Sequence, residues 1–252
     1  MEILLTNDDG PDSPLLGLVA DDLRERGNLT VVVPKNEQSW TGKSMTRFRE
    51  LRLERMGDGA YTVDGTPPDC VNVAVHHLYE ARPDLVVSGI NVGSNTGIGF
   101  AFSSGTVGAC LEANIIGLPA VALSQILGGG LFFEWTDNKR FPESELERLR
   151  AQTRDVLDAV FGRLFERPRF WTDPVTWNVN IPPQTTEDWE VRDTYLSHTF
   201  YGSCFKKEGD VFRHDMDPPT VDTRENADEG VVRKGHVSVS RLDMRTFGQL
   251  EG

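Results

Sequence analysis

Cysteines and long apolar stretches are both scarce in this sequence of 252 residues. The three cysteines, Cys70, Cys110 and Cys204, form an odd set with no CxxC or Cys/His ligand spacing. This argues against a disulfide framework and a structural zinc site, so we expect three reduced thiols. No apolar run approaches the roughly 18 residues that a membrane-spanning helix needs. The sequence therefore predicts no membrane span.

Basic residues are also few. The sequence has 26 lysines and arginines and 39 acidic residues, which gives a formal net charge of -13. A surface of that sign is repelled by nucleic-acid backbones and by anionic lipid, so no nucleic-acid polymer and no membrane is expected as a partner. The first ten residues, MEILLTNDDG, have no basic start and no cleavage-like site. We expect a cytoplasmic protein.

Four common site motifs are missing. The chain contains no GxGxxG followed by an acid on the next strand, no GxxxxGK[ST], no HExxH and no GxSxG. Dinucleotide-binding, P-loop, zincin and hydrolase-elbow functions therefore lack support. With 38% hydrophobic and 26% charged residues, the composition is that of an ordinary globular protein with one main core.

The pattern of apolar residues predicts an α/β fold. Residues 2–6 form a short buried strand, 14–26 an amphipathic helix and 29–34 a β-branched strand, which together make a βαβ unit. The alternation continues downstream, so a mostly parallel sheet is expected. Further helices are expected at 66–78, 103–116 and 143–166, and further strands at 84–88, 120–124 and 176–181.

The C-terminal quarter has a different character. Residues 186–235 are acidic, aromatic and irregular, with short alternating stretches around 195–205. We therefore divide the chain into an α/β core over 1–185 and an arm with a hairpin and a terminal strand over 186–252, which we expect to make oligomer contacts.

The acidic pair Asp8 and Asp9 directly follows the first strand. Adjacent carboxylates repel and raise each other's pKa unless a cation lies between them. Oxygen ligands of this kind suit Mg²⁺ or Mn²⁺. A solvated turn is the alternative for this pair taken alone.

Two more polar clusters follow strands, at the edge where open parallel sheets bind ligands. Residues 38–46, QSWTGKSMT, are rich in hydroxyls, and a plain polar loop is the alternative there. Residues 89–97, GINVGSNTG, lead into Ser103-Ser104-Gly105-Thr106, which opens a helix. Free N–H groups at such a start favour a phosphate, while a capped helix without a ligand is the alternative. Asn91 and Asn95 offer a carbonyl to a metal or an amide to a phosphate.

Five ordered motifs resemble the SurE family of nucleotidases, the stationary-phase survival proteins. They are ILLTNDDG (3–10), QSWTGKSMT (38–46), GTPPDCV (65–71), PDLVVSGINVGSNTG (83–97) and SSGTVGA (103–109). The resemblance weakens after residue 124, to WNVNIP (177–182) and GHVSVS (235–240). It implies a Rossmann-like three-layer core with a swapped C-terminal hairpin arm, and a homodimer or homotetramer.

The activity that the resemblance implies is a metal-dependent 5′-nucleotidase. Its substrates would be nucleoside 5′-monophosphates and, as in some relatives, 3′-monophosphates and short polyphosphate. The family pattern places one divalent ion, Mg²⁺ or Mn²⁺, in each subunit. The implied metal ligands are Asp8, Asp9, Ser39 and Asn91, the implied phosphate-binding residues are Asn95, Ser104, Gly105 and Thr106, and the catalytic carboxylates are Asp8 and Asp9.

Trp40 departs from the family pattern, which usually has glycine at this position, and an indole there would narrow the substrate pocket or stack in it. The arm also lacks the family's usual Asp-Pro-Arg-Gly stretch, so residues 195–215 receive no role. A non-catalytic nucleotide-binding regulatory module and a phosphoryl or glycosyl transferase on a similar sheet are the alternatives to a hydrolase.

Overall fold

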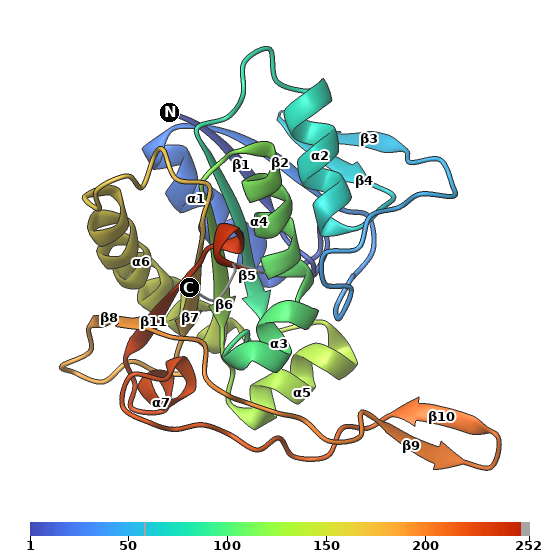
Figure 1. The fold of residues 1–252 in the computed structure, drawn as a ribbon, viewed down its shortest axis with the longest axis vertical. Helices are drawn as coiled ribbons and strands as arrows, with labels where there is room; N and C mark the ends of the chain where they lie inside the picture. The colour runs from blue at the N-terminus through green and yellow to red at the C-terminus, as the bar shows by residue number, and fades with distance from the viewer. Residues whose placement is uncertain (58, 248–252) are drawn as a thin grey trace.

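The computed structural model describes residues 1–57 and 59–247. Its centre is a nine-stranded sheet with the strand order β3-β4-β2-β1-β5-β6-β7-β11-β8 (Figure 1). The strands of this sheet are β1 (Glu2–Thr6), β2 (Asn28–Pro34), β3 (Leu53–Gly57), β4 (Ala60–Val63), β5 (Leu85–Val92), β6 (Ala120–Gln125), β7 (Thr176–Ile181), β8 (Val191–Thr194) and β11 (Val237–Leu242).

The sheet is mostly parallel, which confirms the α/β prediction. Six adjacent strands, β4, β2, β1, β5, β6 and β7, run parallel to one another. At the two ends of this set, β3 pairs antiparallel with β4 and β11 pairs antiparallel with β7. The order reverses between β1 and β5, because β2 lies on one side of β1 and the later strands on the other. Ligands of open α/β sheets bind at such a switch point, beyond the carboxyl ends of the strands.

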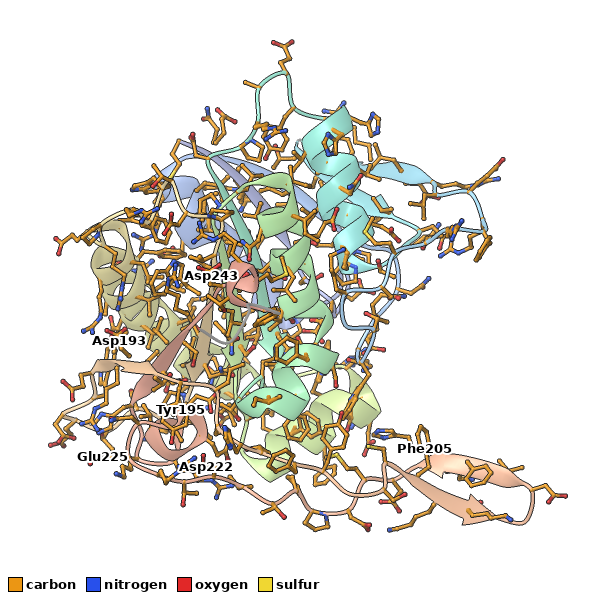
Figure 2. The ribbon with its side chains drawn as sticks, viewed as in Figure 1. Asp193, Tyr195, Phe205, Asp222, Glu225 and Asp243 are labelled. Carbon is orange, nitrogen blue, oxygen red and sulfur yellow. The ribbon has the colours of Figure 1, made fainter. Side chains whose placement is uncertain are left out.

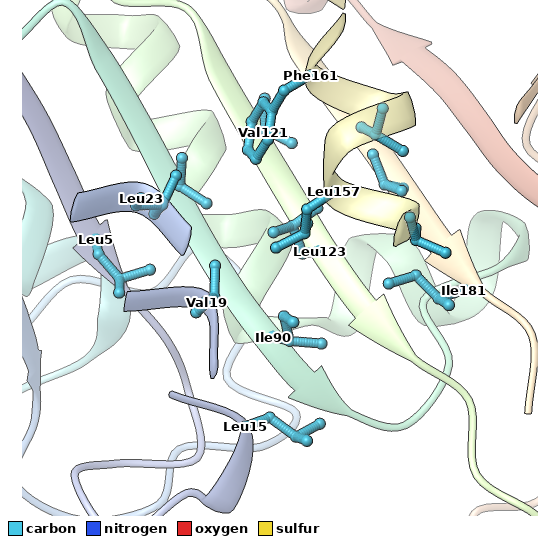
Figure 3. Close-up of a cluster of buried hydrophobic side chains, with 14 of the residues drawn as sticks. Leu5, Leu15, Val19, Leu23, Ile90, Val121, Leu123, Leu157, Phe161 and Ile181 are labelled. Carbon is cyan, nitrogen blue, oxygen red and sulfur yellow. The ribbon is translucent and has the colours of Figure 1, made fainter. Parts of the chain in front are cut away.

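Helices cover both faces of the sheet and complete three layers. They are α1 (Pro14–Arg26), α2 (Pro67–His77), α3 (Gly97–Ser103), α4 (Gly105–Ile116), α5 (Gly129–Asn138), α6 (Glu143–Phe165) and α7 (Asp228–Val232), followed by a 3-10 turn, η1 (Met244–Thr246). Figure 3 shows α1 and α6 on one face, where Val19, Leu23 and Leu157 belong to one buried cluster with Val121 and Leu123. On the other face α2 and α4 bury a second cluster, which includes Cys70 and Cys110.

The helix ends follow their sequence signals. Pro14 begins α1, and Gly27 ends it at a point where a side-chain Cβ would lie 2.3 Å from the Met1 carbonyl oxygen. Thr66 and Asp69 form a reciprocal capping box at α2. The helix expected over 103–116 is α4, which begins at Gly105. Helix α3 was not expected, and the extended backbone of Ser104 separates it from α4.

The C-terminal segment leaves the sheet and returns to it. After β8 the chain runs along the lower edge of the body in Figure 1 to the ribbon formed by β9 (Phe205–Glu208) and β10 (Val211–His214), and then comes back to α7 and β11. Figure 2 labels Tyr195 and Asp222 near the two ends of this excursion and Phe205 at the ribbon. Cys204 there is half-buried. Among the described residues, no helix is long and apolar enough to span a membrane.

Candidate active site

The acidic pair is held by a tight turn at the end of β1. The Asn7 side chain closes the turn, because its Nδ2 donates to the Gly10 carbonyl (2.9 Å) and its Oδ1 accepts from the Gly10 N–H (3.2 Å). Gly10 has a φ of +84°, a conformation that favours glycine. The turn leaves Asp8 and Asp9 only 3% and 9% exposed, at the switch point of the sheet.

Each carboxylate is oriented by a neighbour from another element. The Thr106 hydroxyl donates to Asp8 Oδ1 (2.7 Å), and the Val92 N–H donates to Asp9 Oδ2 (3.0 Å). Burial raises the pKa of Asp8 to about 6, against the Thr106 hydrogen bond that lowers it. Burial and then the charge of Asp8 raise the pKa of Asp9 well above its usual range. A cation bound here would relieve a real electrostatic cost.

The loop after β2 lies against the same turn. The Gln38 N–H donates to the Asp8 carbonyl (2.8 Å), and the Gly42 N–H donates to the Ser103 carbonyl (2.9 Å). Lys43 pairs with the buried Glu112 of α4 at 2.6 Å. These contacts fix both ends of the loop, and Ser39 reaches the pocket between them.

Asn95 is held by the polar ends of β6 and β7. Its N–H donates to Asn180 Oδ1 (2.9 Å), its Nδ2 donates to Ser124 Oγ (2.7 Å), and its carbonyl accepts from Asn178 Nδ2 (2.9 Å). Asn95 is 4% exposed and lines the pocket together with Asn91 at the end of β5. One amide hydrogen and the carbonyl oxygen of its side chain have no hydrogen bond to the described residues, which leaves them available to a ligand.

The α4 N-terminus approaches the acidic pair closely. Ser104 caps the helix by accepting from the Val107 N–H (3.2 Å) and also lines the pocket. A Cβ on Gly105 would lie 2.9 Å from Asp8 Cβ and 3.0 Å from the Gln38 carbonyl oxygen, so only glycine fits there. The Thr106 side chain bonds to Asp8 and does not line the pocket.

These elements surround a pocket of about 490 Å³. Of the residues expected from the sequence, Asp8, Ser39, Asn91, Asn95 and Ser104 line it, while Asp9, Gly105 and Thr106 lie directly behind it. Among the described residues, no three His, Cys, Asp or Glu side chains converge on a metal position. A cation at this pocket would therefore need the neutral oxygens of serine and asparagine beside the two carboxylates.

Sequence reasoning missed most of the pocket's apolar wall. Phe100, Phe132, His214 and Met216 line the pocket in addition to Trp40. His214 and Met216 belong to the excursion between β8 and α7, more than a hundred residues after the polar clusters. Only Trp40 carried a signal in the sequence, as a large aromatic residue within a hydroxyl-rich loop.

Comparison with known proteins gives a consistent result. The family model described as "Survival protein SurE" matches residues 3–203. A relative from Geobacter sulfurreducens named "5'-nucleotidase SurE" is 46% identical over 266 aligned residues, covering 99% of this chain and 91% of its own. One of the same name from Pelobacter propionicus is 48% identical over 198 residues, covering 69% and 78%.

A solved structure agrees with the fold. The crystal structure of the SurE protein from Aquifex aeolicus superposes with a TM-score of 0.71 at 28% identity, and the alignment covers 98% of this chain and 94% of that one. The family match covers the acidic turn, the Ser39 loop, the asparagines and the α4 N-terminus. This chain belongs to the SurE family.

Proposed function

We propose that this protein is a divalent-metal-dependent phosphomonoesterase that hydrolyses nucleoside 5′-monophosphates to nucleoside and phosphate. The 5′-nucleotidase activity is supported by the names of its full-length relatives. The observation that carries the proposal is the buried carboxylate pair, which opens onto a pocket lined by amide and hydroxyl groups at the switch point of the sheet. Nucleoside 3′-monophosphates and short polyphosphate are proposed as further substrates.

The residues fit one Mg²⁺ or Mn²⁺ in each subunit. Two nearly buried carboxylates, Asp8 and Asp9, lie beside Ser39 and Asn91, which add neutral oxygens. Such hard oxygen donors are the ligands these ions prefer. When bound, the ion supplies positive charge against the charge of the phosphate group.

The protein's own groups would hold and polarise the phosphate. The free side-chain groups of Asn95 and the N–H groups at the start of α4, at Ser104, Gly105 and Thr106, would stabilise the developing negative charge. The Thr106 hydroxyl would keep Asp8 in one orientation. Asp8 or Asp9 would accept a proton from the attacking water as the general base.

The C-terminal arm has a proposed role in oligomer contacts. The β9–β10 ribbon exposes Phe205, Val211 and Phe212, each more than half accessible. Apolar side chains on a projecting two-stranded ribbon favour contact with another protein surface. We therefore keep residues 186–252 as the segment that mediates a homodimer or homotetramer, joined to the core of 1–185.

Phosphate release tests the proposal. Nucleoside monophosphates are incubated with the wild type, Asp8→Asn and Asp9→Asn in EDTA, Mg²⁺ or Mn²⁺. Asp12→Asn, which alters an exposed carboxylate close to the turn, is the matched control. We expect metal-dependent release by the wild type and Asp12→Asn, and at least a 100-fold loss in the other two variants. Absence of release with every nucleotide and metal would favour the non-catalytic nucleotide-binding module.

A further inference from the structure

The pocket has two chemically different parts. The carboxylates, hydroxyls and amides described above suit a phosphate and its counter-ion. The remaining wall is aromatic and apolar, and it includes Trp40, Phe100, Phe132, His214 and Met216. A phosphate group uses only the first part, so the second part is available to whatever the phosphate is attached to.

Trp40 is held in an unusual backbone conformation. Its φ of 61° lies in the left-handed region, which costs a non-glycine residue roughly 1–2 kcal/mol. Burial does not offset this cost, because the indole remains 44% exposed. Backbone strain at an exposed side chain beside a pocket points to a functional role rather than a packing role.

Three rings pack against the indole. Phe100, Tyr201 and His214 contact it edge to face, at centroid distances of 6.0, 5.7 and 5.3 Å. Phe100 also contacts Tyr201 at 5.8 Å. Aromatic pairs in this geometry are attractive, so the indole is fixed before a ligand arrives. The indole is partly exposed and lines the pocket.

The C-terminal arm supplies two of these three rings. Tyr201 precedes the β9–β10 ribbon and His214 is its last residue. The first residue of the ribbon, Phe205, is labelled in Figure 2, and its ring centroid lies 5.7 Å from that of His214. A second link comes from Tyr201, whose hydroxyl lies 3.3 Å from the Ser103 hydroxyl. The ribbon base therefore sets the position of the indole at the pocket.

We propose that Trp40 is the stacking platform for a purine base, so that this enzyme discriminates purine from pyrimidine nucleoside monophosphates. The inference rests on the proposed function. It concerns the base, which is the part of the substrate that the metal-binding part of the pocket does not contact. Bases stack on aromatic side chains with a gain that depends on ring area, and a purine offers two fused rings. A fixed, half-exposed indole suits that partner better than a sugar or a single small ring.

Kinetics with matched substrates provide the test. The values of kcat/KM for AMP, GMP, CMP and ribose 5-phosphate are measured for the wild type, Trp40→Ala, Trp40→Phe and Trp171→Phe, an indole of similar exposure outside the pocket. We expect Trp40→Ala to lower the ratio of AMP to ribose 5-phosphate by about 5- to 150-fold, and to lower the ratio of AMP to CMP as well. Trp40→Phe should recover most of the ratio, and Trp171→Phe should leave it unchanged. Equal losses on AMP and CMP, equal losses on all four substrates, or no loss would each overturn the proposal.

Fluorescence separates this inference from the proposed hydrolysis. The chain has five tryptophans, so the signal of Trp40 is the difference between the wild type and Trp40→Phe. AMP should quench the Trp40 fluorescence obtained from that difference, and ribose 5-phosphate should not. If no phosphate is released but AMP still quenches Trp40, the stacking platform stands and the hydrolase proposal fails. If phosphate is released without quenching of Trp40 by AMP, the platform is wrong and the hydrolase proposal stands.

Discussion

The change Asp8→Asn should stabilise the metal-free protein at pH 8 while removing its stabilisation by metal. Burial raises the pKa of Asp8 from its ordinary value of 3.8 to about 6, so the folded protein resists ionisation of this carboxyl. A shift of that size corresponds to about 3 kcal/mol. Asparagine keeps an oxygen that accepts from the Thr106 hydroxyl and has no charge to bury.

The pH dependence follows from which state binds the proton. Between about pH 4 and pH 6 the folded protein keeps a proton that the unfolded chain has lost. The stability of the metal-free wild type therefore falls as pH rises through this range and stays low above it. Asp8→Asn lacks this loss, so its advantage should be about 3 kcal/mol at pH 8 and under about 1 kcal/mol at pH 4.

Urea unfolding measures both effects. The free energy of unfolding is determined in EDTA at pH 4 and pH 8, and again at pH 8 with Mn²⁺ at about 100 times its dissociation constant. The ion should add about 2.7 kcal/mol to the wild type and almost nothing to Asp8→Asn. Asp12→Asn should behave as the wild type throughout. The reasoning is refuted if Asp8→Asn is no more stable than the wild type in EDTA at pH 8.

Two further substitutions test the supports of the site. Gly105→Ala should lower kcat/KM at least 10-fold with little loss of secondary structure by circular dichroism, because its Cβ would push Asp8 aside; an active variant would mean that the α4 start can move. Asp228→Ala should destabilise the protein by about 2–4 kcal/mol in thermal unfolding, because the Gly97 and Ser197 N–H groups both donate to Asp228. It should also raise KM for AMP, and an unchanged KM would show that the arm keeps its place without this carboxylate.

The core and the acidic turn could be predicted because their signals are local. Buried strands such as 2–6 and 176–181 read as short apolar runs, and Asn7 and Gly10 mark the turn that presents Asp8. The sequence did not predict the β3–β4 hairpin, because every residue of β3 is exposed and no alternation of apolar residues indicates a strand there. Helix α5 was missed because only Trp135 of its ten residues is buried.

The apolar wall of the pocket could not be predicted, because it depends on distant contacts. Nothing near His214 or Met216 in the sequence indicates a meeting with Trp40. Thr106 shows a subtler limit. The free N–H groups at the helix start predicted a phosphate site there, but nothing in the sequence indicated that the Thr106 hydroxyl donates to Asp8.

The late return of the chain to the sheet has a consequence for synthesis. Strand β11 lies between β7 and β8, although it is the last strand to be made. Until residues 237–242 emerge, the edge of β7 is unpaired and β8 has no neighbour in the sheet. Open strand edges recruit other chains. A ribosome-bound or prematurely ended copy that lacks residues 237–242 therefore exposes strand edges that β11 covers in the folded protein.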